Sequence, residues 1–237
     1  MKFSEAFPFT FKNLHRQLGH QPHNRLSIVD SCRADDSDFC RETVERGILT
    51  NGQMLHAANR YQLGKSRSGK CIFWMIDEQG IVRDGHIGSS SHDASTWVSQ
   101  QLKGRCPDLA RYVHPQHCLF GLHLHSRVTN AKVCVVEKES SAVILSELFP
   151  DNTWMASVYP MNFNIYSFEP LQGCNVILFP PTDYTMDTYL TWLELADQAR
   201  RSYHLNISVS SILEDCCTLD QKSRGIDLLD FCLENSA

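Results

Sequence analysis

The spacing of hydrophobic residues along the chain changes near residue 130. Before that point the clearest signal is CIFWMID-EQG-IVRDGHI, which begins at Cys71 and places β-branched and aromatic residues on both sides of a short turn with Gly80. This pattern predicts a β-hairpin. Three further stretches, DDSDFCRETVERGI, GQMLHAANRY and ASTWVSQQL, predict helices, and the first of them opens with acidic residues that suit a helix N-terminus. The front half is therefore expected to be a mixed α+β region.

From Lys132 onward, short apolar runs alternate with stretches of helical spacing. The predicted strands are KVCVVE, TWMAS, NVILFP and LNISVS. The predicted helices are SSAVILSELF, the segment from Thr185 to Tyr203, SILEDCC and GIDLLDFCLE. Strands that alternate with helices indicate βαβ units. We therefore predict an α/β fold with a mainly parallel sheet and flanking helices, preceded by the smaller α+β region with its hairpin.

Composition narrows the class of protein. The chain has 237 residues, of which 42% are hydrophobic, enough to bury a core. Its net charge of −5 provides no global basic field that would attract nucleic acid or acidic lipid. The ten cysteines form no CxxC pair, and several lie inside apolar runs, where a reduced thiol packs as a small hydrophobe. Neither a signal-peptide core nor a membrane-spanning run is visible, so we expect a cytosolic protein with no membrane partner.

Carboxylates follow two of the predicted strands and begin the last helix. Glu137 ends KVCVVE, Asp183 follows NVILFPPT, and GIDLLDFCL contains Asp227 and Asp230. Ligands of open α/β sheets bind at the carboxyl ends of the strands, and carboxylates from separate strand ends can hold Mg²⁺. The alternative is structural, because Asp183 and Asp227 are also placed to cap the helices that follow them. The spacing alone favours this capping interpretation.

A basic loop precedes the predicted hairpin. The stretch NRYQLGKSRSGK contains the candidate nucleic-acid-binding residues Arg60, Tyr61, Lys65, Arg67 and Lys70. The basic side chains suit phosphates, and the tyrosine ring suits stacking on an unpaired base. An ordinary solvated loop is an equally good interpretation.

A histidine-rich stretch, HPQHCLFGLHLH, offers nitrogen and sulfur ligands for zinc. Its members are His114, His117, Cys118, His123 and His125. Structural zinc sites use compact CxxC or HxxxH pairs, which are missing here. We interpret these residues as scattered surface or core side chains.

Four stretches together resemble one family. They are RYQLGKSRSGKCIFWMIDEQGIVRDGHI, CLFGLHL, VCVVEKESSAVILSELFPDNTWMAS, and NVILFPPTD with the later GIDLLDFCL. In order and spacing they resemble Toprim-like domains of unassigned function from bacterial plasmids and mobile elements, which are relatives of the catalytic domains of primases. The resemblance covers residues 61 to 234. It divides the chain into an N-terminal helical and loop region of unclear role (1–60), the α+β hairpin region (61–130) and a Toprim-like α/β domain (131–237).

The resemblance implies roles for particular residues. Glu137 matches the glutamate that acts as acid/base or organises a metal, and Asp183 matches the second aspartate of a metal-binding DxD pair. The first aspartate falls on Pro181, which has no side-chain oxygen. A lysine of the family falls on Ser140, and a further glutamate falls on Leu122. The site therefore resembles a magnesium site that has lost members.

A shifted magnesium site remains an alternative under the same resemblance. Its ligands would be Glu137, Glu139, Asp183 and Asp187.

Three functional hypotheses follow from the residues and the resemblance. The first is a primase-related protein of a mobile element or phage-like region, with a degenerate metal site, that acts by binding nucleic acid or a replication partner. The second is an active Mg²⁺-dependent enzyme of nucleotidyl or phosphoryl transfer, with Glu137 and Asp183 as catalytic residues. The third is a regulatory module for protein–protein interaction.

Overall fold

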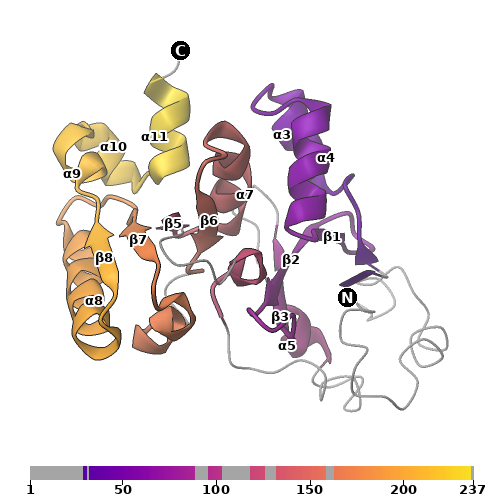
Figure 1. The fold of residues 1–237 in the computed structure, drawn as a ribbon. Helices are drawn as coiled ribbons and strands as arrows, with labels where there is room; N and C mark the ends of the chain where they lie inside the picture. The colour runs from indigo at the N-terminus through magenta and orange to yellow at the C-terminus, as the bar shows by residue number, and fades with distance from the viewer. Residues whose placement is uncertain are drawn as a thin grey trace. The chain divides into compact units, whose positions relative to one another are not determined.

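The computed structural model describes residues 29–30, 32–88, 96–102, 118–125, 132–158 and 163–235. The chain divides into two compact units, Met1–Leu124 and His125–Ala237. Figure 1 shows their helices and strands. Within the described ranges, every helix is too short or too polar to cross a bilayer.

The first unit contains an antiparallel sheet in the order β1-β2-β3-β4. Its strands are β1 (Gly64–Lys65), β2 (Cys71–Ile76), β3 (Val82–Gly88) and β4 (Thr96–Trp97). Its helices are α3 (Asp38–Glu45), α4 (Asn51–Arg60), α5 (Val98–Leu102) and the 3-10 turn η2 (Leu122–Leu124). Strands β2 and β3 pair in antiparallel register, which confirms the predicted hairpin. Every residue of β2 is buried, as its unbroken apolar run requires.

The hairpin turn is organised by Asp77, which is buried. One carboxylate oxygen accepts hydrogen bonds from the backbone N–H groups of Gln79 (2.9 Å) and Ile81 (2.8 Å). The other accepts from the guanidinium of Arg83 at 2.7 Å. Gly80 follows with φ of 76°, a left-handed conformation that glycine adopts without strain. The aspartate, the glycine and the arginine together fix the register of the two strands.

Contacts between aromatic rings connect α3 and the segment before η2 to the sheet of this unit. Phe39 of α3 meets Phe73 of β2 edge-on at 5.4 Å, and Phe120 meets the same ring at 5.7 Å. After Phe120 the chain turns at Gly121, which has φ of 83°, and continues as η2.

The second unit is an α/β layer with a parallel sheet in the order β6-β5-β7-β8. Its strands are β5 (Lys132–Val136), β6 (Thr153–Ala156), β7 (Asn175–Leu178) and β8 (Asn206–Val209). Its helices are α7 (Glu139–Leu148), η3 (Ile165–Leu171), α8 (Asp187–Tyr203), α9 (Ile212–Cys216), α10 (Leu219–Arg224) and α11 (Leu228–Asn235). All strand pairs are parallel, which confirms the predicted α/β fold with a preceding α+β region. Figure 1 shows α9, α10 and α11 grouped at one end of this sheet.

Candidate functional site

Glu137 directly follows β5, the strand that pairs with both β6 and β7. Its side chain is half-buried, and none of the described residues hydrogen-bonds its carboxylate. Burial raises the pKa of Glu137, the charge of Lys138 lowers it, and the charges of Asp227 and Glu139 raise it further, so the net shift is upward. A carboxyl group with a raised pKa at a strand end is a candidate acid/base.

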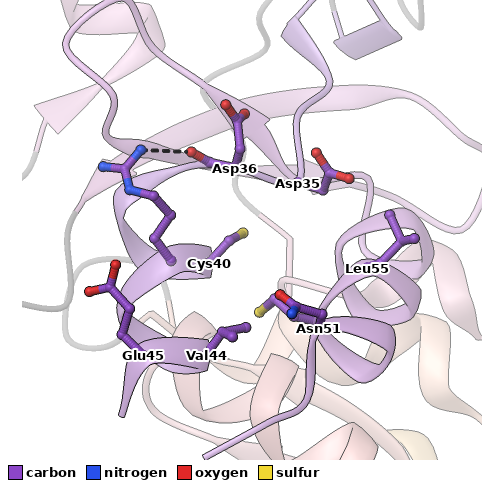
Figure 2. Close-up of a pocket in the computed structure, with 9 residues that line it drawn as sticks. Asp35, Asp36, Cys40, Val44, Glu45, Asn51 and Leu55 are labelled. Carbon is purple, nitrogen blue, oxygen red and sulfur yellow. Dashed lines mark hydrogen bonds between the residues drawn. The ribbon is translucent and has the colours of Figure 1, made fainter. Parts of the chain in front are cut away.

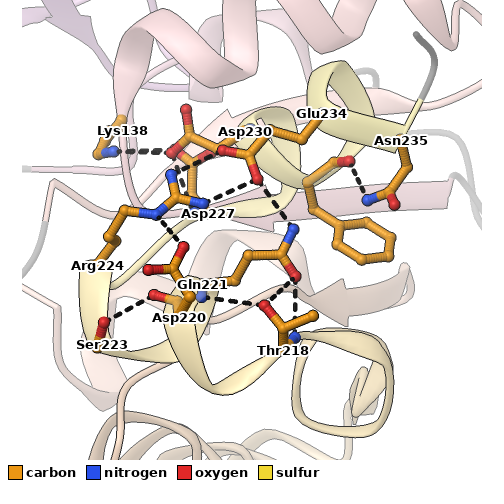
Figure 3. A network of polar contacts seen from close by, with 11 residues as sticks. Lys138, Thr218, Asp220, Gln221, Ser223, Arg224, Asp227, Asp230, Glu234 and Asn235 are labelled. Carbon is orange, nitrogen blue, oxygen red and sulfur yellow. Dashed lines mark hydrogen bonds and ion pairs between the residues drawn. The ribbon is translucent and has the colours of Figure 1, made fainter.

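Lys138 is the next residue, and its ammonium faces two carboxylates from the start of α11 (Figure 3). The Nζ atom lies 3.4 Å from Oδ2 of Asp227 and 3.6 Å from Oδ2 of Asp230. Partial burial lowers the pKa of Lys138, but the attraction of Asp227 and Asp230 outweighs it and the net shift is upward. Burial and the charge of Asp227 raise the pKa of Asp230. The carboxyl edge of β5 therefore carries a lysine among three acids.

Asp227 and Asp230 also cap α11. Oδ1 of Asp227 accepts the backbone N–H of Asp230 at 3.0 Å, and Oδ2 of Asp230 accepts the backbone N–H of Asp227 at 3.2 Å. This reciprocal pair satisfies N–H groups at the helix N-terminus, as in a capping box. The capping role expected for Asp227 is confirmed. Asp227 is buried and also accepts a hydrogen bond from Ser141 of α7.

An arginine fixes the helix that carries these aspartates (Figure 3). Arg224, at the end of α10, donates to both carboxylate oxygens of Glu234 in α11, at 2.7 and 3.0 Å. It also donates to Asp220, one turn earlier, at 3.1 Å. A bidentate contact between a guanidinium and a carboxylate fixes the relative orientation of the two groups as well as their distance. The chain between α10 and α11, where Asp227 lies, is thereby held from both sides.

Asp183 caps α8. Its Oδ1 accepts the N–H groups of Thr185 (2.9 Å) and Asp187 (3.1 Å) and faces the Thr185 hydroxyl at 2.9 Å. Its Oδ2 accepts the N–H of Thr188 at 2.8 Å. Partial burial raises the pKa of Asp183, but the hydrogen bonds from Thr188, Thr185 and Asp187 prevail and lower it to about 2. The capping role expected for Asp183 is confirmed.

The PPT segment between β7 and Asp183 connects the sheet to the C-terminal helices. Pro181 and Thr182 are both buried. The Thr182 hydroxyl donates to Oε1 of Glu214 at 2.7 Å, and Nζ of Lys222 donates to Oε2 of the same carboxylate at 2.7 Å. The backbone N–H of Thr182 donates to the carbonyl of Ile226 at 3.0 Å. At the position where the resemblance places a first aspartate, the chain therefore has a packed structural joint.

Two of the four residues expected to hold magnesium, Asp183 and Asp187, are engaged in hydrogen bonds at the start of α8. Three backbone N–H groups donate to the Asp183 carboxylate, and the single hydroxyl proton of Thr185 is shared between the carboxylates of Asp183 and Asp187. Oδ2 of Asp187 faces the Thr185 hydroxyl at 2.7 Å, and Glu139 is buried in the first turn of α7. Among the described residues, no group of three or more histidines, cysteines or acids is arranged to hold a metal ion. Magnesium at Glu137 stays a prediction.

The histidine-rich stretch is only partly described. Half-buried His123 has its Nε2 atom 3.3 Å from the carbonyl oxygen of Arg60, and partial burial lowers the pKa of the ring. His125 lies in the second unit, where its ring nitrogens are 3.8 and 3.9 Å from the sulfur of Cys174. His114 and His117 lie outside the described residues.

The basic loop contains exposed, paired and buried members. Arg67 is exposed in the turn between β1 and β2, and Lys70 is partly exposed. Lys65 forms an ion pair with Asp36. We expected Tyr61 to stack on an unpaired base, but this expectation is wrong because of where the ring lies. Its ring is fully buried and stacks on Phe120, with centroids 5.2 Å apart, so it has no face left for a base.

A cavity of about 460 Å³ lies between α3 and α4 in the first unit (Figure 2). It is lined by Asp35, Asp36, Cys40, Arg41, Val44, Glu45, Asn51, Met54 and Leu55. Burial raises the pKa of the Cys40 thiol, whose sulfur accepts a hydrogen bond from Ser37 at 3.1 Å. None of the residues expected to form a site lines this cavity, and no pattern in the sequence indicated it.

Sequence reasoning did not identify three residues at the carboxyl edge of the sheet. They are Lys138, Ser141 and Thr182. Lysine after a strand-terminal glutamate is a usable signal, because the edge of a parallel sheet gathers such residues. The serine and threonine roles depend on partners 86 and 32 residues away, respectively.

Comparisons with known proteins place the fold. A family model described as "Domain of unknown function (DUF6371)" matches residues 43–182. None of the curated proteins matches the chain in sequence. The solved DnaG catalytic core is similar over 91% of this chain and 83% of its own length, with 12% identity and a TM-score of 0.52.

Two other solved primases are similar as well. The Aquifex aeolicus primase, comprising zinc-binding and RNA polymerase domains, is covered over 64% of its length by 91% of this chain, with 11% identity and a TM-score of 0.50. The primase fragment of the bacteriophage T7 primase-helicase is covered over 66% of its length by 76% of this chain, with 13% identity and a TM-score of 0.47. The likeness to the DnaG core and to the Aquifex protein shows that this chain has the fold of a primase catalytic core.

Proposed function

We propose that this chain, which belongs to the DUF6371 family, is a primase-related protein with a degenerate metal site that acts by binding nucleic acid or a replication partner. The mobile-element setting and the cytosolic location implied by the sequence are part of this proposal. One observation carries it. At the carboxyl edge of the sheet, Asp183 is committed to capping α8, and a packed joint that includes Pro181 precedes it.

The nucleic acid in this proposal contacts the loop between β1 and β2. Exposed Arg67 and partly exposed Lys70 project from a short turn, with Lys65 and Arg60 close in sequence. Lysine and arginine bind phosphates without reading the base sequence, and release of counterions makes such binding salt-dependent. Because the chain is acidic overall, with a net charge of −5, we expect the binding to be local and modest in strength.

Fluorescence anisotropy with labelled single-stranded DNA and RNA tests the binding. Arg67→Ala should weaken binding to all sequences and reduce the slope of log affinity against log salt by about 0.7, the value for one phosphate contact on a single strand. Arg46→Ala is the matched control, since Arg46 is also exposed in the first unit but lies at the end of α3. Wild-type protein that binds no strand at low salt, or equal losses in both variants, would refute the nucleic-acid part.

A second candidate function is favoured by Glu137. Its raised pKa and the lack of a hydrogen bond from any described residue suit a catalytic acid/base in nucleotidyl or phosphoryl transfer. In this alternative, Mg²⁺ would bind at Glu137 and the chain would act as an enzyme of primase or nuclease type.

Calorimetric titration separates the two candidates. Mg²⁺ and Mn²⁺ are titrated into the wild type and into Glu137→Gln. Binding by the wild type that is lost in the variant would show that the metal site is retained and overturn the degenerate-site proposal, and primer-synthesis and nicking assays would then test for an enzyme. Heat changes equal to dilution at millimolar metal would support the degenerate site.

A further inference from the structure

The cavity between α3 and α4, the α3–α4 groove, has an apolar floor (Figure 2). Cys40 and Val44 line it from α3, where they are one helical turn apart, and Met54 and Leu55 line it from α4. Cys40 is 1% exposed and Met54 2%. The volume of about 460 Å³ falls within the range of ligand sites, roughly 300–1,000 Å³. The groove is therefore large enough to receive part of another molecule.

Leu55 forms an exposed apolar lip of this groove. It is 47% exposed, and within the described part of the first unit it is the one large hydrophobic residue that water reaches to this extent. The apolar surface therefore continues from the floor onto the outside of α4. A small ligand in the cavity would leave Leu55 in water, whereas a peptide segment covers the floor and Leu55 together. Amphipathic segments bind apolar grooves in this way.

Two carboxylates on the rim of the groove lack an opposite charge among the described residues. Asp35 and Glu45 are exposed, and neither side chain forms an ion pair or a hydrogen bond within that part of the chain. The third acid, Asp36, is paired with Lys65. The guanidinium of Arg41 donates to the backbone carbonyl of Asp36 at 3.0 Å. The rim therefore has an excess of negative charge.

The charge of the acids before α3 reaches the floor of the groove. Burial raises the pKa of the Cys40 thiol, the hydrogen bond from Ser37 partly offsets this, and the charges of Asp35 and Asp36 raise the pKa further. Both carboxylates therefore act on the interior of the groove as well as on bulk water. A cationic group at the rim would meet a complementary charge, and an anionic group would be repelled.

A second copy of this chain does not match the groove. A symmetric dimer through this surface would bring Asp35 and Glu45 of both copies together, and like charges across an interface are costly. The complementary surface instead combines positive charge with a large apolar side chain.

We propose that the α3–α4 groove is a docking site for a basic amphipathic segment of a partner protein, with an apolar side chain of the segment between Val44 and Leu55 and a lysine or arginine against Glu45. The inference rests on the partner-binding part of the proposed function, for which it supplies a surface and the chemistry of the partner. It is independent of nucleic-acid binding, because Arg67 and Lys70 do not line the groove.

Peptide selection with the full chain tests the proposal. A random library of short peptides displayed on phage is selected on the wild type, after removal of peptides that bind the double variant Glu45→Lys, Leu55→Ser. The enriched peptides should carry lysine or arginine three or four positions from a large apolar residue, the spacing that places two side chains on one face of a helix. They should contain few acids, because the rim repels them.

Fluorescence anisotropy with an enriched, labelled peptide separates the two parts of the groove. Leu55→Ser should weaken binding about tenfold or more, because apolar surface that the peptide covers is lost. Glu45→Lys should weaken it about threefold to tenfold, and this loss should shrink in high salt. The matched controls lie outside the groove: His56→Ser at the next position of α4, and Glu78→Lys in the hairpin turn, which changes the net charge equally. Both should bind as the wild type does.

Each substituted residue is exposed or half-buried, so the variants should fold, and urea midpoints check this. A selection that enriches no peptide beyond those that bind the double variant overturns the inference. Enriched peptides without basic residues, or equal losses in the controls, overturn it as well. Self-association of the wild type that Leu55→Ser abolishes, measured by sedimentation velocity, would also overturn it, because a second copy would then be the occupant.

Separate measurements on the wild type decide the proposed function. A failed selection together with salt-dependent binding of strands at Arg67 overturns the inference alone. Metal binding that requires Glu137 overturns the degenerate-site proposal, whatever the peptide selection yields.

Discussion

The hydroxyl of Ser141 donates a 2.7 Å hydrogen bond to Oδ2 of Asp227, 86 residues further along the chain. Both side chains are buried. The bond links the first turn of α7 to the N-terminus of α11, and it satisfies a carboxylate that water cannot reach. Ser141→Ala should therefore lower the free energy of unfolding by about 1–3 kcal/mol, the cost of leaving a buried charged acceptor short of a donor.

Urea unfolding at neutral pH measures this loss as a lower midpoint with an unchanged slope. Ser140→Ala is the matched control, because Ser140 occupies the preceding position of α7, is only half-buried, and has no hydrogen bond to a described residue through its side chain. The control should stay within about 0.5 kcal/mol of the wild type. Equal losses in both variants would contradict the assignment of the loss to this bond, because alanine has a higher helix propensity than serine and the change of propensity would stabilise α7.

The sequence predicted the architecture because its signals are local. The apolar run from Cys71 to Ile76 and the turn at Gly80 specify a hairpin by themselves, and the alternation after Lys132 specifies βαβ units. The capping roles of Asp183 and Asp227 were also accessible, since a cap acts on the helix that follows it directly in the chain.

The candidate site was less accessible because its contacts are distant in sequence. The partners of Lys138 lie about 90 residues downstream, so no local pattern reveals the ion pair. Tyr61 failed as a base-stacking residue for a similar reason. Its partner Phe120 comes from another part of the first unit and covers the ring. The polar residues that surround Tyr61 in the sequence did not indicate that its side chain is buried.

Removal of the cap on α8 should have a pH-dependent effect. The folded pKa of Asp183 is about 2, below its ordinary value of 3.8. A lowered folded pKa stabilises the native state above the ordinary value, and the contribution is lost as the pH falls from 3.8 towards 2. Asp183→Ala should cost about 0.5–2 kcal/mol at neutral pH, and the difference from the wild type should shrink in acid.

Urea midpoints measured at neutral pH and at several acidic values check this prediction. Asp151→Ala serves as the control, since Asp151 lies exposed in the turn between α7 and β6. Its midpoint should follow that of the wild type at every pH. A difference between Asp183→Ala and the wild type that stays constant into acid would contradict the assignment of the carboxylate as the cap.

Gly85 allows a tightly packed contact across the hairpin. It lies opposite Trp74 in the register of β2 and β3. A Cβ atom at Gly85 would lie 2.8 Å from Cε3 of Trp74 and 2.8 Å from Cγ2 of Val98. Because both neighbours are fully buried, they have no room to retreat. Gly85→Ala should lower the free energy of unfolding by about 1–3 kcal/mol through overpacking.

Gly52→Ala is the opposite case and the control for the same measurement. Gly52 lies in the first turn of α4, and a Cβ atom there would meet nothing within 4 Å. Alanine also has less conformational freedom to lose on folding, so this variant should be stabilised by up to about 1 kcal/mol. Urea midpoints that shift in opposite directions would confirm both predictions. A Gly85→Ala variant with the same urea midpoint as the wild type would contradict the close packing between Gly85 and Trp74.

Glu137 should destabilise the native state at neutral pH. Burial, partly offset by Lys138 and reinforced by Asp227, raises its folded pKa above the ordinary 4.5. The native state then binds the proton more tightly than the unfolded chain, so stability is greatest below 4.5 and falls as the pH rises through the folded pKa. Glu137→Gln, which stays neutral, should therefore have the higher urea midpoint at neutral pH and a similar midpoint well below 4.5.

Glu169→Gln, at an exposed position in η3, should show no such pH-dependent gain. A Glu137→Gln variant that is less stable than the wild type at neutral pH would mean that the carboxylate of Glu137 contributes to the charge balance around Lys138 more than its burial costs.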